Sequence, residues 1–245
     1  MDRAQPLPLY YRIKQDLLVA IDEGRLQPGD RVPSERELTE NYKVSRMTAR
    51  HALAILEQEG FLRRVQGKGS FVAPPKLEQT LLGLTSFTEE MRRRGLVPST
   101  QVRLVEEVRA GERVAEHLKA LPEERIYMVE RLRLASGDPM ALERVYLPMR
   151  LVQGLPDLDL TGSLYEILIQ HFGIRLVNAV QSLEAVLADP EESAALHVPL
   201  GSALLAMTRV SYSATGEPIE YVRSLYRADR YRFTVSLSRK EDVAL

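Results

Sequence analysis

Apolar residues recur at helical spacing near the start of the chain, between Pro8 and Gly24. A repeat of three to four residues places them on one face, which predicts a helix that ends at Gly24. The turn-forming run Gln27-Pro-Gly-Asp follows this helix. The apolar positions are Tyr11, Ile13, Leu17, Leu18 and Ile21.

Two shorter helices are predicted next. Ser34 and Glu37 have the spacing of a capping box, so a second helix begins at Ser34 and ends near Tyr42. A third helix is capped by Ser45 and runs to Gln58, before a closing glycine. Its buried stripe consists of Ala49, Ala52, Leu53 and Leu56.

A two-stranded wing completes this first part of the chain. Strands are predicted over 61–65 and 70–73, around the tight turn Gln66-Gly-Lys-Gly. Two short helices followed by a wing are typical of a winged helix-turn-helix, a shape that enters a DNA groove. The stiff run Ala73-Pro-Pro-Lys then marks a domain boundary.

The remaining two-thirds of the chain has the mixed pattern of an α+β domain. Helical periodicity predicts helices at 86–94, 112–120, 163–172 and 190–196. Alternating polar and apolar positions predict strands near 101–109, 126–135, 140–147, 180–188, 203–213, 219–227 and 231–237.

An internal echo links two of the predicted hairpins. Ala135-Ser-Gly-Asp-Pro-Met-Ala-Leu-Glu matches Ala214-Thr-Gly-Glu-Pro-Ile-Glu-Tyr-Val, 79 residues later. Each run places a Gly-acid-Pro turn before a strand. Shared turn chemistry alone would give a shorter match, so the echo favours two hairpins related by pseudo-symmetry in one sheet.

Composition narrows the functional class. The chain has 245 residues, 44% hydrophobic and 27% charged, with no cysteine and four scattered histidines. Disulfides and thiolate metal sites are therefore excluded, and we expect neither a metal nor a cofactor. The chain has no run of about 18 apolar residues. Its start lacks an apolar signal-peptide core. We expect a cytoplasmic protein without a membrane partner.

The net charge of −1 argues against nucleic-acid binding only when the chain is treated as a whole. Residues 1–76 hold 13 basic and 10 acidic side chains, a net charge of +3, and the remainder carries −4. The basic excess thus lies in the predicted winged helix-turn-helix, although ordinary charge scatter could also produce it.

The third helix has the side chains of a DNA-reading element on its first turns. Arginine can bond a guanine edge with two hydrogen bonds, and serine or threonine can reach bases or phosphates. Wing glycines let the backbone approach a minor groove, where a lysine would contact phosphate. The alternative is a solvated helical hairpin with an arginine-rich face. The candidate DNA-binding residues are Arg36, Ser45, Arg46, Thr48, Arg50, Gly67, Lys68 and Gly69.

An anion site is predicted in the second part of the chain. Ser86 and Ser163 each begin a Ser-x-x-Glu capping box, and helix N-termini attract phosphate or carboxylate groups. Strand alternation places Arg131 and Arg133 on one face, two residues apart. Together these groups would bind an anion strongly. The alternative is that the arginines balance neighbouring acids and the boxes only cap.

The hairpin echo adds a second cluster. Applying the offset of 79 residues places Glu143, Glu220 and Tyr226 on equivalent faces of two related strands. Two carboxylates and a phenol in one cavity would hydrogen-bond hydroxyl or amine groups. The alternative is three surface side chains on a solvated sheet face.

The first part resembles the DNA-binding domain of GntR-type bacterial transcription regulators. The resemblance covers residues 6–73 and rests on Leu-x-Pro-Gly-Asp-Arg-Val-Pro-Ser-Glu-Arg-Glu-Leu from Leu26 to Leu38, on Ser-Arg-Met-Thr-Ala-Arg and on Gly-Lys-Gly-Ser-Phe-Val. It implies DNA contacts at Arg36, at the start of the third helix and at the wing glycines. It also implies a homodimer on a near-palindromic operator, and repression is usual in the family.

The second part resembles the UTRA effector domain of the HutC-like subfamily, whose fold is similar to chorismate lyase. The resemblance rests on the runs that begin at Leu84, Arg131 and Pro218. It implies the domains 1–73 and 81–245, joined by a linker at 74–80. In amino-sugar-responsive members the matching positions hold phosphate through Phe87, Thr88, Arg131, Arg133, Ser163 and Tyr165, and sugar through Glu143, Glu220 and Tyr226.

Three alternatives stay open at this stage. The resemblance favours a phosphorylated amino sugar such as N-acetylglucosamine 6-phosphate or glucosamine 6-phosphate as the effector. The same regulator could instead bind another sugar phosphate, urocanate or a fatty-acid-related carboxylate. A lyase-like enzyme would use Glu143 and Glu220 as an acid–base pair, but catalysis gives the attached winged helix no role.

Overall fold

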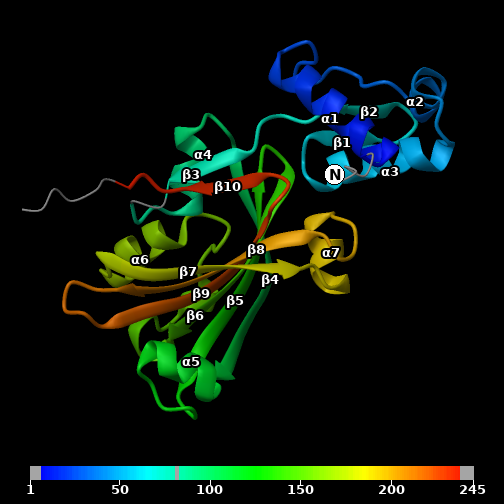
Figure 1. The fold of residues 1–245 in the computed structure, drawn as a ribbon. Helices are drawn as coiled ribbons and strands as arrows, with labels where there is room; N and C mark the ends of the chain where they lie inside the picture. The colour runs from blue at the N-terminus through cyan, green and yellow to red at the C-terminus, as the bar shows by residue number, and fades with distance from the viewer. Residues whose placement is uncertain (1–6, 81–82, 238–245) are drawn as a thin grey trace, which may run out of the picture. The chain divides into compact units, whose positions relative to one another are not determined.

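The chain folds into two compact units, and the computed structural model describes residues 7–80 and 83–237 (Figure 1). The first unit ends at Leu77 and also takes in Ala228–Tyr231, while the second contains Glu78–Arg227 and continues from Arg232. The segment predicted as a linker, 74–80, contains a short strand. The division into domains 1–73 and 81–245 stays a prediction.

The first unit has the predicted order of three helices and two strands. Its elements are α1 (Leu9–Asp22), α2 (Glu35–Tyr42), α3 (Arg46–Gln58), β1 (Leu62–Val65) and β2 (Gly69–Val72). The Ser34 hydroxyl accepts the Glu37 amide while the Glu37 side chain accepts the Ser34 amide, so the predicted capping box is formed. The winged helix-turn-helix is therefore confirmed.

A single apolar core holds this unit together. α1 contributes Ile13 and Leu17, and α3 contributes Leu56, which is fully buried. The remaining buried members are Val32, Leu38, Val44, Ala49, Ala52, Leu53, Leu62 and Val72. Since these residues follow the helical stripes of the sequence, the fold places the polar faces of α2 and α3 outward.

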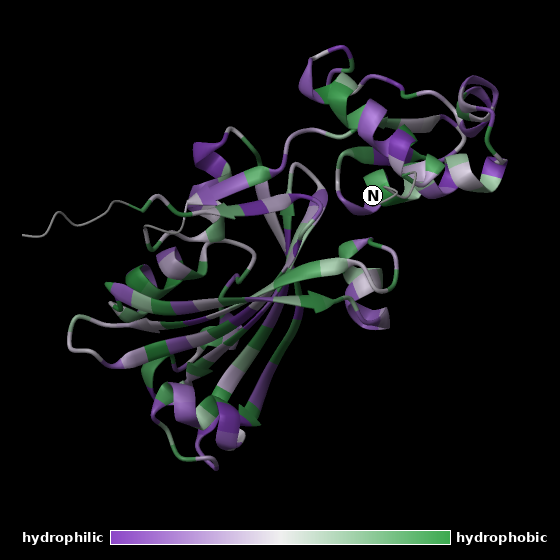
Figure 2. Ribbon diagram, viewed as in Figure 1, coloured by the Kyte–Doolittle hydropathy of each residue, from purple (hydrophilic) through white to green (hydrophobic). Residues whose placement is uncertain are grey.

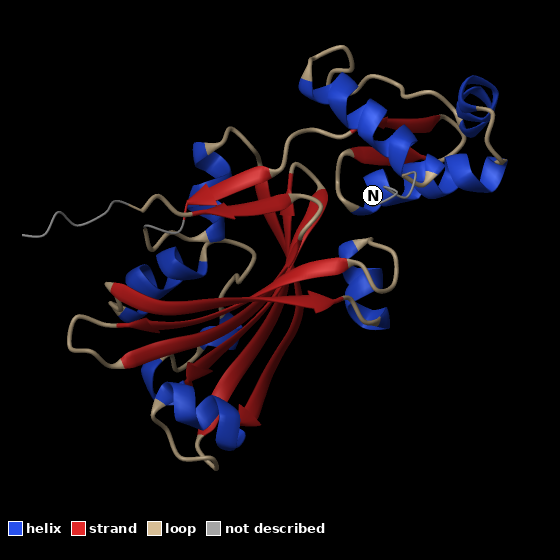
Figure 3. Ribbon diagram, in the orientation of Figure 1, coloured by secondary structure: helices blue, strands red, loops and turns tan. Residues whose placement is uncertain are grey.

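The second unit is built on a six-stranded antiparallel sheet with strand order β4-β5-β6-β9-β8-β7 (Figure 3). This confirms the predicted α+β class. The strands are β4 (Pro98–Arg109), β5 (Arg125–Ala135), β6 (Asp138–Pro148), β7 (Asn178–Leu187), β8 (Ala203–Tyr212) and β9 (Pro218–Arg227). The helices are α4 (Phe87–Arg93), α5 (Gly111–Leu118), α6 (Leu164–Phe172) and α7 (Pro190–Leu196), with 3-10 turns η1 (Met149–Leu151) and η2 (Leu155–Asp157).

The sheet consists of two three-stranded meanders that meet at its centre. β4, β5 and β6 form one, β7, β8 and β9 form the other, and β6 pairs antiparallel with β9. Arg144 pairs with Arg223, and these two positions are related by the 79-residue offset of the sequence echo. Both echoing hairpins thus lie in one sheet, as predicted.

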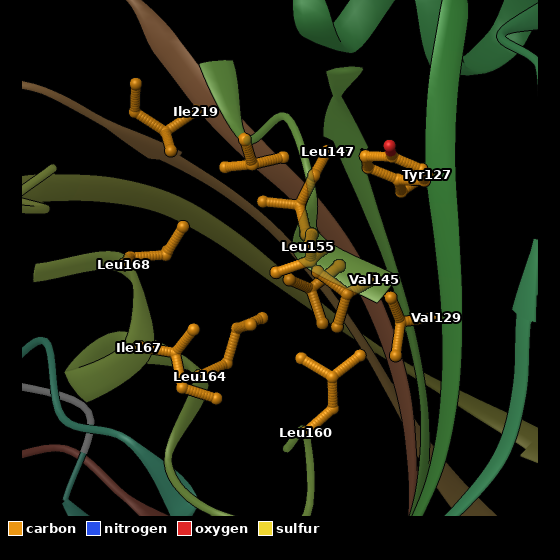
Figure 4. Packing of buried hydrophobic residues seen from close by; sticks show 12 residues of the cluster. Tyr127, Val129, Val145, Leu147, Leu155, Leu160, Leu164, Ile167, Leu168 and Ile219 are labelled. Carbon is orange, nitrogen blue, oxygen red and sulfur yellow. The ribbon is translucent and has the colours of Figure 1, made fainter. Parts of the chain in front are cut away.

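Each face of the sheet is covered by helices. On one face, Leu164, Ile167 and Leu168 of α6 pack against Val145 and Val129 in a buried cluster (Figure 4). On the other face, α5 and α7 pack against separate apolar clusters that contain Ile126 and Leu142, respectively. In Figure 2 hydrophobic and hydrophilic residues alternate along the strands, as burial beneath helices on part of each face requires.

One strand was not predicted. β3 (Leu77–Thr80) pairs with β10 (Tyr231–Thr234) in a separate two-stranded sheet. The sequence Leu-Glu-Gln-Thr is too short and too polar to give a strand signal, and its partner lies near the other end of the chain. Within the described residues, no helix is long and apolar enough to cross a membrane.

Candidate functional site

A polar cavity lies in the second unit, between the sheet, α6 and the start of α4. It is narrow, with a free volume of about 30 Å³. Its lining residues come from seven elements and the loop before α4: Gln79, Thr85, Ser86, Phe87, Arg131, Arg133, Glu143, Leu164, Tyr165, Met207, Arg209, Glu220, Val222 and Tyr226.

One end of the cavity carries two buried arginines from β5. Arg131 and Arg133 are 3% and 2% exposed, and strand alternation places both on the face that carries Glu143. The Arg131 guanidinium donates to Glu143 Oε2 from Nη2 at 2.6 Å and from Nε at 3.0 Å. Arg133 Nη1 lies 3.9 Å from the same oxygen. A carboxylate therefore already occupies the anion-binding side of this arginine pair.

The charge state of Glu143 follows from these neighbours. Burial on its own would raise the pKa of Glu143, but the positive charges of Arg131 and Arg133 and the hydrogen bonds from Arg131 outweigh it. The net result is a lowered pKa. Glu143 is thus ionised at neutral pH and balances the arginines.

The first turn of α4 completes the arginine end. Arg133 Nη2 donates to Thr88 Oγ1 at 3.0 Å, and its guanidinium lies 4.7 Å from the centre of the Phe87 ring. Ser86 and Glu89 form the second predicted capping box, which fixes the start of this helix. Two side chains of α4 therefore contact the same cation.

The opposite end of the cavity carries Glu220 on β9. Its Oε1 accepts from Ser211 Oγ at 2.8 Å and from the Tyr165 hydroxyl at 3.1 Å. Burial and the negative charge of Glu143 raise the pKa of Glu220, against the hydrogen bond from Ser211 and the charge of Arg209. The two glutamates of the cavity therefore have pKa values shifted in opposite directions.

Arg209 and Tyr165 lie beside Glu220, and Tyr226 adds a second phenol to the cavity. Arg209 donates to the Tyr165 hydroxyl from Nη1 at 3.0 Å and to Gln181 Oε1 from Nη2 at 2.6 Å. Burial raises the pKa of Tyr226 to about 12, so this phenol keeps its proton. The pKa of Tyr165 is also raised, first by burial and then by the charge of Glu220. These groups offer both donors and acceptors to a bound polar molecule.

Eight of the ten predicted effector residues line this one cavity: Ser86, Phe87, Arg131, Arg133, Glu143, Tyr165, Glu220 and Tyr226. Thr88 lies behind them, bonded to Arg133, and Ser163 caps α6 at 2% exposure. Their role in binding an effector stays a prediction. Sequence reasoning missed Arg209 and Gln79, because the first needs the β8–β9 register and the second needs strand β3.

The recognition-helix candidates lie together in the first unit. Ser45 is the N-cap of α3, and its hydroxyl accepts the Thr48 amide at 3.1 Å. Arg46 Nε and Arg50 Nε each donate to the carboxylate of Glu35, at 3.0 Å. Sequence reasoning missed Glu35, which lies at the first position of α2 and is visible only once α2 and α3 are docked.

The carboxylate of Glu35 is the shared anionic partner of several arginines on this surface. Hydrogen bonding by Arg50 lowers the pKa of Glu35, with a further contribution from Arg46, against the effect of burial. Arg64 of the wing lies 4.0 Å from the same carboxylate. A groove of about 290 Å³ runs beside these side chains and between α2, α3 and the wing. The predicted Arg36 also lines this groove, but its guanidinium lies 3.8 Å from Glu40 and no ion pair joins it to Glu35.

The wing tip is shaped by its glycines. Gly67 and Gly69 have φ values of 74° and 111°, which residues other than glycine rarely adopt. A Cβ at Gly67 would meet no atom within 4 Å, so the tip is open. The exposed Lys68 stands between them. Across the parts of the chain that the structure describes, no group of three or more His, Asp or Glu side chains could hold a metal ion.

Two family models match the chain. Residues 9–72 match the model described as bacterial regulatory proteins, gntR family, and residues 93–232 match the UTRA domain. The first match covers the winged helix-turn-helix and the second covers nearly all of the cavity-bearing unit. The arginine-rich groove falls in the first matched region, and the cavity falls in the second except for Gln79 and residues 85–87, which precede it.

Individual relatives extend over nearly the whole chain. The HTH-type transcriptional repressor NagR of Bacillus subtilis (strain 168) is 37% identical over 239 residues, 98% of each chain. The histidine utilization repressor of Pseudomonas putida is 32% identical over 235 residues, 96% of this chain and 94% of the relative. The crystal structure of PhnF from Mycobacterium smegmatis superposes with a TM-score of 0.66 at 32% identity, covering 93% of this chain and 100% of PhnF.

Proposed function

Because the chain belongs to the GntR family of bacterial regulatory proteins, in the HutC-like branch that carries a UTRA domain, we propose that it is a transcriptional repressor released from its operator by a phosphorylated amino sugar. Glucosamine 6-phosphate and N-acetylglucosamine 6-phosphate are the preferred effectors. The observation that carries this proposal is one cavity that combines two buried arginines, held by Glu143, with a second glutamate, Glu220, bonded by hydroxyl groups.

The arginine end supports a phosphate rather than a neutral group. Arg131 and Arg133 are nearly fully buried, and buried cations require an anionic partner. Glu143 supplies that partner now. A phosphate brings more charge and more acceptor oxygens than one carboxylate, so it competes for these guanidinium groups. Thr88 and the first turn of α4 lie beside Arg133 and add donors to the same anion.

The opposite end supports a polar, amine-bearing ring. When a phosphate takes over Arg131, the Glu143 carboxylate needs new donors, and a sugar hydroxyl or amino group provides them. Glu220 and Tyr165 add further acceptors and donors at that end, and Tyr226 adds a phenol to the cavity wall. This arrangement favours an amino sugar over a plain carboxylate such as urocanate, which has no groups for both glutamates.

The first unit supplies the DNA contact. Arg46, Arg50 and Arg64 gather around one carboxylate beside the wing, and DNA phosphates or guanine edges would compete for them. A single winged helix makes few base contacts, so we propose a homodimer whose two copies bind half-sites about one DNA turn apart. Effector binding then favours the DNA-incompetent arrangement of the dimer.

An acid–base enzyme is the competing function, since two carboxylates with opposite pKa shifts also suit general acid–base catalysis. The two functions differ in the fate of the ligand. A repressor returns its effector unchanged after prolonged incubation, whereas a lyase would convert it. Chromatography of the incubated mixture distinguishes the two. Conversion of either amino-sugar phosphate would overturn the repressor proposal.

The effector is tested by calorimetry on the full-length protein with glucosamine 6-phosphate, N-acetylglucosamine 6-phosphate, glucose 6-phosphate and urocanate. We expect the two amino-sugar phosphates to bind more tightly than glucose 6-phosphate, and urocanate to give no heat. Absence of binding by both amino-sugar phosphates would refute the proposed effector.

Replacing Arg133 with Ala tests the anion end. We expect effector affinity to fall by about a hundredfold, because charge-assisted hydrogen bonds are lost, while operator binding persists. Fluorescence anisotropy on a labelled operator reports both quantities. The exposed Arg113→Ala on α5 is the matched control and should behave as the original protein. If the effector released the Arg133 variant from the operator at the concentration that releases the original protein, Arg133 would not be part of the anion site.

A further inference from the structure

Gln79 is a buried polar residue on β3 that lines the cavity. It is 7% exposed, whereas its neighbours Glu78 and Thr80 on the same strand are exposed. Within the described residues its side-chain amide makes no hydrogen bond to protein. The amide atoms are not among the fully buried, unpartnered polar atoms of the protein, so they still face open space although most of the residue is covered. The amide is therefore available to a molecule in the cavity.

Gln79 lies on the side of the cavity that carries Arg209. Gln79 and Arg209 are the two residues that line both the cavity and a neighbouring groove of about 430 Å³. Arg209 in turn bonds Tyr165, next to Glu220. A glutamine amide offers one acceptor and two donors, which matches the hydroxyl, amino or acetamido groups of a sugar.

Gln79 also differs from most of the wall in the element that carries it. The charged groups of the cavity stand on β5, β6, β8 and β9, which belong to the six-stranded sheet. β3 pairs only with β10, in a separate sheet. The cavity thus has one wall fixed by long hydrogen-bonded ladders and another wall, formed by β3 and the start of α4, that can shift without breaking those ladders.

The cavity is narrow, because the space open to the centre of a water-sized molecule is only about 30 Å³. A sugar phosphate therefore needs rearrangement of the lining. The sheet strands cannot retreat without losing hydrogen bonds between them, whereas the cavity side chains, β3 and the start of α4 can give way. In the sequence β3 directly follows the run Ala73-Pro-Pro-Lys that leaves the DNA-binding unit.

We propose that the Gln79 amide is an effector contact made only in the DNA-released form, so that it carries part of the coupling between the cavity and the operator. The inference rests on the proposed function. A group on the shifting wall bonds the effector in one position of β3 and not in the other. Differential binding of this kind is what allows a ligand to shift a conformational equilibrium.

Gln79→Met tests the contact, since methionine has a similar length but no amide. We expect the free variant to bind glucosamine 6-phosphate about tenfold more weakly in calorimetry, the loss expected for one or two hydrogen bonds. Its melting temperature without effector should stay equal, because the amide makes no hydrogen bond within the described residues that the variant would lose. A purely structural role for Gln79 would instead lower that melting temperature and overturn the inference.

Coupling is measured by repeating the titration with saturating operator DNA. In the original protein the operator weakens effector binding by a certain factor, and in Gln79→Met we expect that factor to be about tenfold smaller, because only the released form loses a bond. Glu78→Gln is the matched control on the outward face of β3, and its factor should be unchanged.

Two results would overturn the inference alone. If Gln79→Met bound the effector as tightly as the original protein does, the amide would make no contact with it. Equal weakening with and without operator would show that the contact is the same in both forms and carries no coupling. If the original protein itself binds neither amino-sugar phosphate, the proposed effector fails and this inference fails with it.

Discussion

Two glutamates share one cavity, but their carboxyl groups meet different neighbours. Glu143 is bonded by a guanidinium, and the lowered pKa keeps it charged. Glu220 is bonded by two hydroxyl groups, and burial raises its pKa. The same residue type therefore has two electrostatic roles, one as a counter-ion and the other as an acceptor whose charge costs stability.

Replacing Glu220 with Gln should stabilise the protein at neutral pH. The raised pKa means that the folded state holds its proton longer than the unfolded state. The stabilisation from neutral Glu220 is therefore full below 4.5, its ordinary pKa, and is lost as the pH rises through 4.5 to the raised value. Glu220→Gln avoids that loss, so its melting temperature should exceed that of the original protein at pH 7.5 and match it near pH 4.

Glu143→Gln provides the contrast for this measurement. A lowered pKa contributes stability above 4.5 that disappears as the pH falls through the folded value. The variant should therefore lose about 2 kcal/mol of unfolding free energy at neutral pH, because a hydrogen-bonded buried ion pair is broken. Melting curves across pH decide the matter. A Glu220 variant that is destabilised at every pH would contradict the predicted sign.

At the scale of elements, the first turn of α4 contains both the capping box of the helix and the residues that contact Arg133. The Ser86–Glu89 capping box satisfies its first amides, and the next two residues contact Arg133. A helix of seven residues has little intrinsic stability, so its cap and its packing decide whether it forms. If α4 contacts the effector as proposed, the strength of its cap affects effector binding.

Ser86→Ala should cost about 1 kcal/mol of unfolding free energy, and Ser86→Gly only a few tenths, since glycine tolerates the cap position. Chemical denaturation measures the difference. Effector affinity should follow the same order, because a frayed first turn holds Phe87 and Thr88 less firmly. Equal affinities for the Ala and Gly variants, despite unequal stabilities, would show that the cap has no part in the site.

The elements also show how far a single sequence leads. Arg131 and Arg133 could be placed together because strand alternation alone fixes their common face, without knowledge of the pairing. The echoing turns likewise located Glu143 and Glu220. Arg209 required the register between β8 and β9, and Gln79 required a polar four-residue strand whose partner is near the other end of the chain. Contacts that are distant in sequence leave no local periodicity to detect.

At the scale of the whole molecule, DNA affinity and effector affinity belong to different units of one chain. The basic excess of residues 1–76 is only three charges, and Glu35 neutralises part of it within the DNA-binding surface. DNA affinity that depends on so few charges is modest and falls with salt. A modest affinity is one that a small effector can overcome, because a typical coupling is worth a factor of about 5 to 150.

Thermodynamic linkage makes this coupling reciprocal. We expect saturating operator DNA to weaken binding of the amino-sugar phosphate by the same factor by which the effector weakens operator binding. Calorimetry with and without operator gives the first factor, and anisotropy with and without effector gives the second. Because equality is a thermodynamic necessity, unequal factors would show that one titration had not reached equilibrium or saturation, and factors of one would show that no coupling exists.

The two meanders of the sheet share their turns but differ in the residues that they place at equivalent positions. Positions related by the offset of 79 hold unlike residues: Ala141 answers Glu220, Glu143 answers Val222, and Leu147 answers Tyr226. Each of these three polar groups thus has an apolar counterpart in the other meander, so the two halves of the sheet differ in chemistry although they share their turns. A duplicated scaffold that differs in this way can acquire a new ligand by editing one copy while its twin preserves the sheet.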